Sequence, residues 1–234
     1  MCFFCLQQRK DKSSYFFSGG DRVLAMRDFF VSYRKTKLDS SEVVVSVDIP
    51  FSTEHDHVHA FKLSKRKDDD LAIVTSCFYV RLDEQRTVTD SCIAFGGVSA
   101  VPVGSSKTSS AILGKTWDRS MVELLQTQLA AEHLIPTSVP GGVPEYRRAA
   151  VASTALKFVF HVLHELQPEE VAERERSAIQ DVVRPVSASN QVFEAALVNK
   201  GDGVDTVGKP KKHLSALEQA SEHITSNACV VDRV

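Results

Sequence analysis

The 234-residue sequence lacks a long hydrophobic run and an excess of charge of either sign. Its first ten residues, "MCFFCLQQRK", hold too short an apolar stretch for a signal peptide or a membrane span. The net charge is -2, from 28 Lys and Arg against 30 Asp and Glu, so no basic surface for nucleic acid or anionic lipid is indicated. We therefore expect neither a nucleic acid nor a membrane as a partner.

The sequence also lacks a paired set of cysteines. An odd and scattered set does not predict a disulfide framework, and it favours a reducing, cytoplasmic compartment. The first two cysteines form one C-x-x-C pair, but a structural zinc or iron–sulfur site needs further ligands at matching spacing. The five cysteines are Cys2, Cys5, Cys77, Cys92 and Cys229. They predict no metal site.

Histidines recur at every second position in "EHDHVH". On an extended strand His55, His57 and His59 would share one face, as zinc or copper ligands can. No second cluster of ligands accompanies them, and Asp56 would face away. We therefore interpret the three histidines as a solvated strand entry and predict no metal.

Alternating apolar and polar residues in the first half of the chain predict strands at residues 42–51, 57–65, 71–82 and 87–98. The last two are separated by the polar "DEQR", which indicates an antiparallel hairpin. Residues 1–20, which include "SSYFFSGG", are expected to be irregular.

The second half of the chain predicts helices. Ser106 or a near neighbour can cap a short helix that ends at Gly114, and Ser120 with Glu123 has the spacing of a capping box for the next helix. A third helix follows Pro144 and ends before Pro168. Its expected apolar stripe is Ala152, Ala155, Leu156, Val159, Val162, Leu163 and Leu166.

These patterns predict an α+β fold, in which a small antiparallel sheet of three to four strands packs on a bundle of about three helices. Residues 169–234 are polar and weakly periodic, so we expect a long irregular tail there.

Two glycine motifs do not predict a nucleotide site. "GKT" at 114–116 ends like a phosphate-binding loop, but Ser109 stands where that motif needs a glycine. "GGV" occurs at 96–98 and 141–143, outside any strand, glycine loop and helix context, so these glycines are interpreted as turn residues.

Five segments carry a family resemblance. They are "FFVSYRKTKLDSSEVVVSVDIPF", "AFKLSKRKDDDLAIVTS", "IAFGGVSAVPV", "PGGVPEYRRAAVASTALKFVF" and "VGKPKKHLSALEQAS". In this order and spacing they resemble the molybdenum hydroxylase family, to which xanthine dehydrogenase and aldehyde oxidase belong. The resemblance covers residues 22–221. Residues 1–20 depart from it, as does "EHITSNACVVDRV" after Ser221.

The resemblance implies a division of the chain into three parts. Residues 1–20 are an irregular segment. Residues 21–168 resemble the C-terminal subdomain of the FAD domain, also known as the CO dehydrogenase flavoprotein C-terminal domain. Residues 169–234 resemble a linker and the truncated start of the molybdenum-cofactor region. The family also binds molybdopterin and 2Fe-2S clusters, and the motifs that hold them do not occur in this sequence.

The resemblance implies five cofactor-binding residues. Lys62 matches the lysine near FAD in an A-F-K block, and Val44 matches an aliphatic residue, usually leucine, that contacts the flavin. Arg66, Asp69 and Asp70 match a charged loop beside the flavin ring. Such a loop can tune the flavin potential and admit a charged nucleotide. Taken without the resemblance, these residues indicate an ordinary strand and a solvated loop. No catalytic residue is implied.

The implied function is part of the FAD site of a xanthine dehydrogenase-like molybdo-flavoprotein oxidoreductase that passes electrons to NAD. A full-length relative would be a homodimer that oxidises a purine or an aldehyde. We expect the purified chain to bind FAD weakly or not at all, to hydroxylate no xanthine and to reduce no NAD. The alternatives left open are a non-catalytic binding or assembly module and an incomplete gene product.

Overall fold

The computed structural model describes residues 14–17, 20–39, 42, 44, 46, 47, 49–66, 70–180 and 214. The chain divides into two compact units, Met1–Gln180 and Asp181–Val234. All helices and strands of the described part belong to the first unit. The expected tail beyond residue 180 lies outside the described residues, apart from Leu214.

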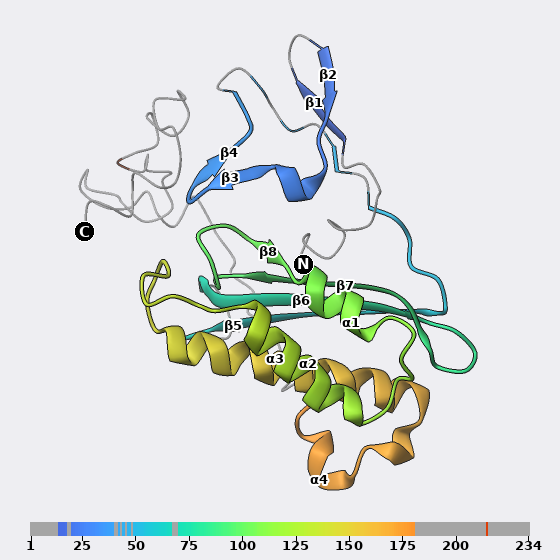
Figure 1. The fold of residues 1–234 in the computed structure, drawn as a ribbon. Helices are drawn as coiled ribbons and strands as arrows, with labels where there is room; N and C mark the ends of the chain where they lie inside the picture. Colours follow the sequence, from blue (N-terminus) through green and yellow to red (C-terminus); the bar gives the residue numbers. More distant parts are fainter. Residues whose placement is uncertain are drawn as a thin grey trace, which may run out of the picture. The chain divides into compact units, whose positions relative to one another are not determined.

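A four-stranded antiparallel sheet forms one layer of this unit (Figure 1). Its strands are β5 (Asp56–Ser64), β6 (Ala72–Leu82), β7 (Val88–Gly96) and β8 (Val103–Gly104), in the order β5-β6-β7-β8. The predicted strands at 57–65, 71–82 and 87–98 are confirmed, as is the hairpin between the last two. β5 shows the expected alternation, since Phe61 and Leu63 pack against the core, whereas β6 and β7 are buried on both faces over part of their length and have longer apolar runs.

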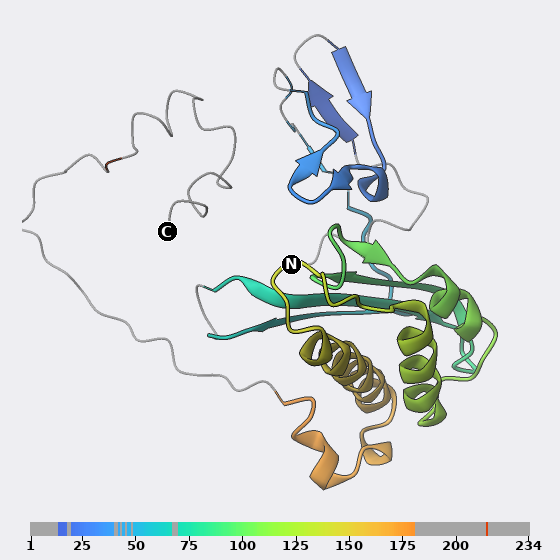
Figure 2. The ribbon, with the colours of Figure 1, turned by 60° about the vertical axis from the view of Figure 1, so that its left-hand side comes forward.

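Three helices form the second layer. They are α1 (Ser106–Ile112), α2 (Ser120–Glu132) and α3 (Pro144–Leu166), and all three lie against the same face of the sheet (Figures 1 and 2). After α3 come a 3-10 turn, η3 (Pro168–Glu170), and the short α4 (Glu173–Arg176). The predicted α+β fold of a small antiparallel sheet on about three helices is confirmed.

Aromatic rings form the centre of the core between the two layers. Phe158 of α3 stacks on Phe78 of β6 with ring centroids 4.9 Å apart, and Trp117 meets Phe158 edge to face at 5.4 Å. All three rings are completely buried. Each such ring buries a large apolar area, so this cluster contributes much of the stability that joins sheet to helices.

The stripe predicted for α3 is partly right. Ala155, Val159, Val162 and Leu163 are buried as expected, whereas the remaining three members, Ala152, Leu156 and Leu166, are only half-buried. Phe158 belongs to the buried face although the predicted stripe omitted it. The sheet covers a wider arc of the helix than the aliphatic pattern alone suggested.

The cap predicted for α2 is wrong. Ser120 is already the first helical residue, and it donates from its backbone nitrogen and its hydroxyl to Oδ1 of Asp118, at 2.8 and 2.6 Å. Asp118 therefore stabilises the helix start, as a carboxylate near exposed amide groups can. The predicted positions of Pro144 at the start of α3 and of Gly114 after α1 are confirmed, and Gly114 has φ +74°.

The prediction that residues 1–20 are irregular is wrong at their described end. β1 (Ser14–Phe17) pairs antiparallel with β2 (Gly20–Val23). Three consecutive aromatic residues have high β-propensity, and the glycines after them suit a hairpin turn, so the "YFFSGG" stretch contained a strand signal. Residues 1–13, 18 and 19 lie outside the described part of the chain.

The strand predicted at 42–51 is also wrong at its described positions, none of which lies in a strand. A strand needs a hydrogen-bonded partner, and these residues make other contacts. Val47 packs with Phe29, next to η2 (Met26–Asp28) and the small hairpin of β3 (Phe30–Ser32) and β4 (Lys35–Thr36). Glu42 accepts hydrogen bonds from Arg22 and from the backbone nitrogen of Asp39, both at 2.7 Å.

Among the described residues, every helix is too short or too polar to cross a membrane.

Candidate functional site

The face of the sheet that points away from the helices carries short side chains in register. Lys62 of β5 lies opposite Thr75 of β6, which in turn lies opposite Gly96 of β7. A neighbouring row, made of Ala60, Cys77 and Ala94, follows the same order of strands. Because cross-strand partners share a face, these two rows form one shallow surface, which we call the outer strip.

The outer strip is open at one side only. Ala60 and Lys62 are exposed and Thr75 is half-buried. Cys77 and Ala94, in the second row of the strip, are buried. They form a small cluster with Tyr79 and Cys92, which lie farther along the same face. The accessible part of the strip therefore lies at β5, around Lys62.

Gly96 keeps this surface shallow. A Cβ atom at that position would lie 2.5 Å from Oγ1 of Thr75, which is closer than side-chain atoms can approach. The absence of a side chain at Gly96 therefore leaves room for the Thr75 hydroxyl. In the row from Lys62 to Gly96, the lysine is the one long side chain.

A charged loop leaves the same end of β5. Asp70 accepts hydrogen bonds from the backbone nitrogen of Arg66 at 2.7 Å and from that of Leu71 at 2.9 Å. Ser64 donates from its hydroxyl to the carbonyl oxygen of Arg66. The loop is thus closed by its own polar groups, as Asp-rich turns often are.

Electrostatics link this loop to Lys62. The backbone amide of Arg66 is the main cause that lowers the pKa of Asp70, and burial opposes it. The amide of Leu71 and the charges of Arg66 and Lys62 lower that pKa further. Arg66 and Asp70 therefore lie in one loop after the end of β5 that carries Lys62, and the lowered pKa keeps Asp70 ionised near pH 7.

The other two predicted site residues are not tied to this group. Asp69 lies outside the described residues. Val44 lies outside the described strands and is 37% exposed. Its place beside Lys62 stays a prediction.

Arg147 fixes the backbone behind the site, and sequence analysis missed it. This buried side chain donates from Nε to the carbonyl oxygen of Gly142 and from Nη1 to that of Gly97, both at 2.6 Å. Nη1 also donates to the carbonyl oxygen of Ile73. The two "GGV" segments thus meet at one guanidinium, where Arg147 joins the start of β6 to the end of β7. The repeated "GGV" motif was visible in the sequence, but the sequence did not show that Arg147 binds both copies.

A second polar network at the far end of the outer face was also missed. Arg81 donates to both carboxylate oxygens of Asp56, at 2.8 and 3.0 Å, and the Tyr79 hydroxyl donates to Asp56 at 2.8 Å. Burial alone would raise the pKa of Asp56, but these bonds, with two from Thr53, hold it well below its usual range. The pairing depends on the β5-β6 register, which the sequence did not specify.

Two of the three histidines in "EHDHVH" face α3 and share one carboxylate. Glu165 lies 2.7 Å from Nδ1 of His57 and 2.8 Å from Nε2 of His59. The interpretation of solvated histidines is wrong for these two, whose side chains are 12% and 22% exposed, because the carboxylate of α3 lies above them. His55 is 53% exposed, as expected. Among the described residues, no group of His, Cys, Asp or Glu could hold a metal ion.

The comparison with protein families finds one matching model. Residues 59–162 match the CO dehydrogenase flavoprotein C-terminal domain. That range begins in β5 and ends in α3, so it contains Lys62, Arg66, Asp70 and Arg147.

Curated proteins give matches over most of the chain. It is 34% identical over 200 residues to xanthine dehydrogenase of Calliphora vicina, a match that covers 82% of this chain and 15% of that protein. It is 33% identical over 220 residues to a nicotinate hydroxylase of Emericella nidulans, with 92% and 15% covered. The chain thus corresponds to a small part of the length of these relatives.

A solved structure has the same fold. Quinoline 2-oxidoreductase from Pseudomonas putida 86 superimposes with a TM-score of 0.56 at 21% identity, over 76% of this chain and 56% of that chain. At this identity the likeness supports the fold alone.

Proposed function

We propose that the outer strip forms one wall of a flavin site. The premise is that residues 59–162 match the CO dehydrogenase flavoprotein C-terminal domain, in a chain that is similar to part of xanthine dehydrogenase of the molybdenum hydroxylase family. The chain corresponds to the C-terminal part of the FAD domain of such molybdo-flavoproteins. The observation that carries the proposal is the open row of Lys62, Thr75 and Gly96 beside a charged loop.

The residues of the outer strip fit a flavin ring. A flat ring system needs a surface without protruding side chains, and Ala60, Thr75 and Gly96 supply one, since a Cβ at Gly96 would already clash with Thr75. When bound, FAD supplies the transfer of electrons between a donor and NAD. The strip offers a cation, Lys62, at its exposed side.

The residues at the Lys62 end of the outer strip have different proposed roles. Lys62 favours negative charge on a reduced ring, because a nearby cation stabilises an anion. Arg66 and Asp70 form a rim of mixed charge, and Asp69 is proposed to belong to it. Val44 is proposed as an apolar contact with the ring.

Arg147 acts as a positioning residue. By holding Ile73 and Gly97, it fixes the ends of β6 and β7 next to Thr75 and Gly96. The remaining groups that bind FAD are proposed to come from the part of the FAD domain that the matched region of the relatives does not include. NAD, a purine or aldehyde substrate, and a homodimeric assembly are proposed only for a full-length protein of this kind.

The proposal is tested in a chimera. Residues 59–162 of this chain replace the matched region of Calliphora vicina xanthine dehydrogenase, and Lys62→Ala is compared with Lys107→Ala, which removes an exposed lysine from α1. We expect Lys62→Ala to lower the flavin content or shift the flavin reduction potential, while Lys107→Ala leaves both unchanged. A Lys62→Ala chimera with the content and potential of its parent would contradict the proposal.

A further inference from the structure

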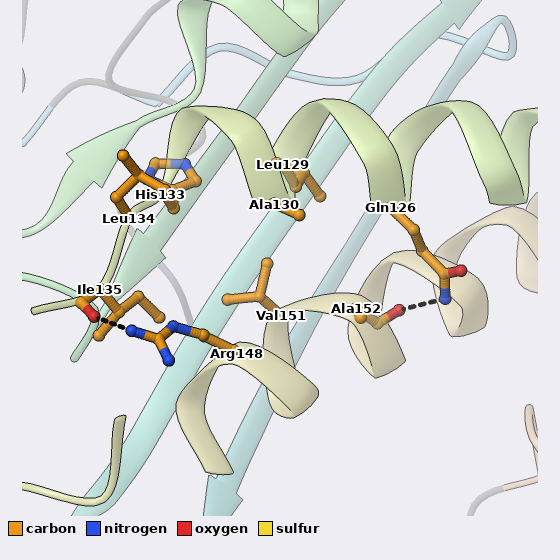
Figure 3. A pocket seen from close by; sticks show the side chains of 9 residues that line it. All are labelled: Gln126, Leu129, Ala130, His133, Leu134, Ile135, Arg148, Val151 and Ala152. Atoms are coloured by element: carbon orange, nitrogen blue, oxygen red, sulfur yellow. Dashed lines mark hydrogen bonds between the residues drawn. The ribbon is translucent and has the colours of Figure 1, made fainter. Parts of the chain in front are cut away.

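A cavity of about 190 Å³ lies on the helical side of the sheet, between α2 and α3 (Figure 3). Leu129 and Ala130 of α2 face Val151 and Ala152 of α3 across it. Protein interiors are normally close-packed, so an open apolar space of this size between two helices is unusual. Two small alanines leave the space that larger side chains would fill.

Hydrogen bonds close the cavity at both ends. At one end, Gln126 donates from Nε2 to the carbonyl oxygen of Ala152 at 3.0 Å (Figure 3). At the other end, Arg148 donates from Nη2 to the carbonyl oxygen of Ile135 at 2.5 Å. The first bond joins α2 to α3, and the second joins α3 to the segment that follows α2, so groups on both sides of the space are held in place and the cavity is preformed.

The charge of the cavity comes from Arg148. The lining residues include no carboxylate, and burial lowers the pKa of the other titratable lining residue, His133, so that its ring is neutral near pH 7. A guanidinium has five N–H groups, and its hydrogen bonds here engage one with Ile135 and one with Glu145. Glu145 is 83% exposed, so its pairing with Arg148 is weak and can be exchanged.

We propose that this cavity binds a small apolar carboxylate, with its ring or chain between Ala130 and Val151 and its carboxylate on the guanidinium of Arg148. The volume suits one aromatic ring with a short side chain, since a dry cavity of about 150 Å³ holds benzene. Leu134, which is 81% exposed, extends the apolar surface at the cavity. This site is independent of the flavin wall on the other face of the sheet.

The probes are 3-phenylpropionate, its neutral amide 3-phenylpropanamide, and propionate. Each is titrated into the full chain labelled with nitrogen-15, and binding is followed by the amide signals of α2 and α3. We expect 3-phenylpropionate to saturate these signals, the amide to bind roughly tenfold more weakly, as the loss of a charge-assisted hydrogen bond implies, and propionate not to bind.

Two variants and one control complete the experiment. Ala152→Leu fills the cavity and should abolish binding, and Arg148→Gln should weaken 3-phenylpropionate to the level of the amide. Arg174→Gln changes an exposed arginine of α4 that does not line the cavity, so it should bind like the parent. Arg148 is exposed, so Arg148→Gln should fold. This variant therefore tests the proposal even if Ala152→Leu does not fold.

Three results would overturn the proposal. The first is no saturable binding of 3-phenylpropionate at millimolar concentration. The second is unchanged affinity in Arg148→Gln. The third is equal binding of acid and amide, which would indicate a slot for an uncharged side chain of a partner protein instead.

Discussion

At the scale of single residues, Gly97 and Gly114 offer a direct contrast. Both have positive φ, +83° and +74°. A Cβ at Gly97 would lie 2.1 Å from the carbonyl oxygen of Ile73, whereas nothing lies within 4 Å of a Cβ at Gly114. We expect Gly114→Ala to cost about 1 kcal/mol from backbone strain alone, and Gly97→Ala about 3 kcal/mol. Urea unfolding of both variants measures the difference, and equal losses would show that the contact with Ile73 is unimportant.

Arg147 is a second residue whose loss should destabilise the sheet. Its guanidinium satisfies three backbone carbonyls while only 5% exposed. Arg147→Ala leaves those acceptors without their donor, so we expect a loss of about 3 kcal/mol in the free energy of unfolding. The exposed Arg174→Ala serves as the control and should change stability by less than about 0.5 kcal/mol. An Arg147→Ala protein as stable as this control would refute the role given to the side chain.

The sequence predicts the position of a single residue when neighbouring residues determine it, and fails when the residue contacts a distant part of the chain. Alternation placed Lys62 on the face opposite Phe61 and Leu63, and the structure confirms it, since the two apolar residues pack against the core. No local pattern could show that Arg147 reaches Ile73, because 74 positions separate them. Local periodicity shows which face of a strand or helix a side chain occupies. The distant residues that the side chain contacts depend on the fold.

At the scale of elements, β5 and α3 are joined by Glu165. Its hydrogen bonds to His57 and then to His59 lower the pKa of Glu165 well below its usual range, against an opposing effect of burial. A carboxyl group with a lowered pKa stabilises the fold above its ordinary pKa of 4.5, and that contribution is lost as the pH falls below it. The link between strand and helix should therefore weaken in acid.

This link can be measured with Glu165→Gln. Because Glu165 is 45% exposed, we expect the variant to lose only about 1 kcal/mol at pH 7. The difference in stability between the variant and the parent should narrow as the pH falls below 4.5. Glu165 of the unfolded parent, with its ordinary pKa, then takes up a proton while the folded carboxylate stays ionised, which favours unfolding of the parent. Urea midpoints of both proteins at pH 7, 5 and 3 give the comparison. A gap that stays constant or widens toward pH 3 would contradict the assignment.

Elements were predictable where an apolar pattern was long and the element packs against the core. β6, β7 and α3 meet that condition, and their predicted positions are confirmed. The 42–51 segment has equally regular alternation, yet its described residues are tied to Arg22 and Phe29 rather than to a neighbouring strand. β-propensity is a preference for pairing, and the sequence does not show which partner is available.

At the scale of the whole molecule, one sheet separates two different surfaces. The helices cover one face of the sheet (Figure 2). The cavity lies between α2 and α3, and the other face of the sheet carries the outer strip. The fold class followed from the sequence alone. The proposed flavin wall needed the register of three strands as well, because only the register puts Lys62, Thr75 and Gly96 in one row.

The most direct test of that wall is a titration of the nitrogen-15-labelled chain with FMN, a soluble flavin. If the outer strip contacts the flavin ring, weak binding at millimolar FMN should shift the amide signals of Ala60, Lys62 and Thr75, and Lys62→Ala should reduce those shifts. Saturable shifts confined to α1, α2 and α3, with none on the outer strip, would contradict the account.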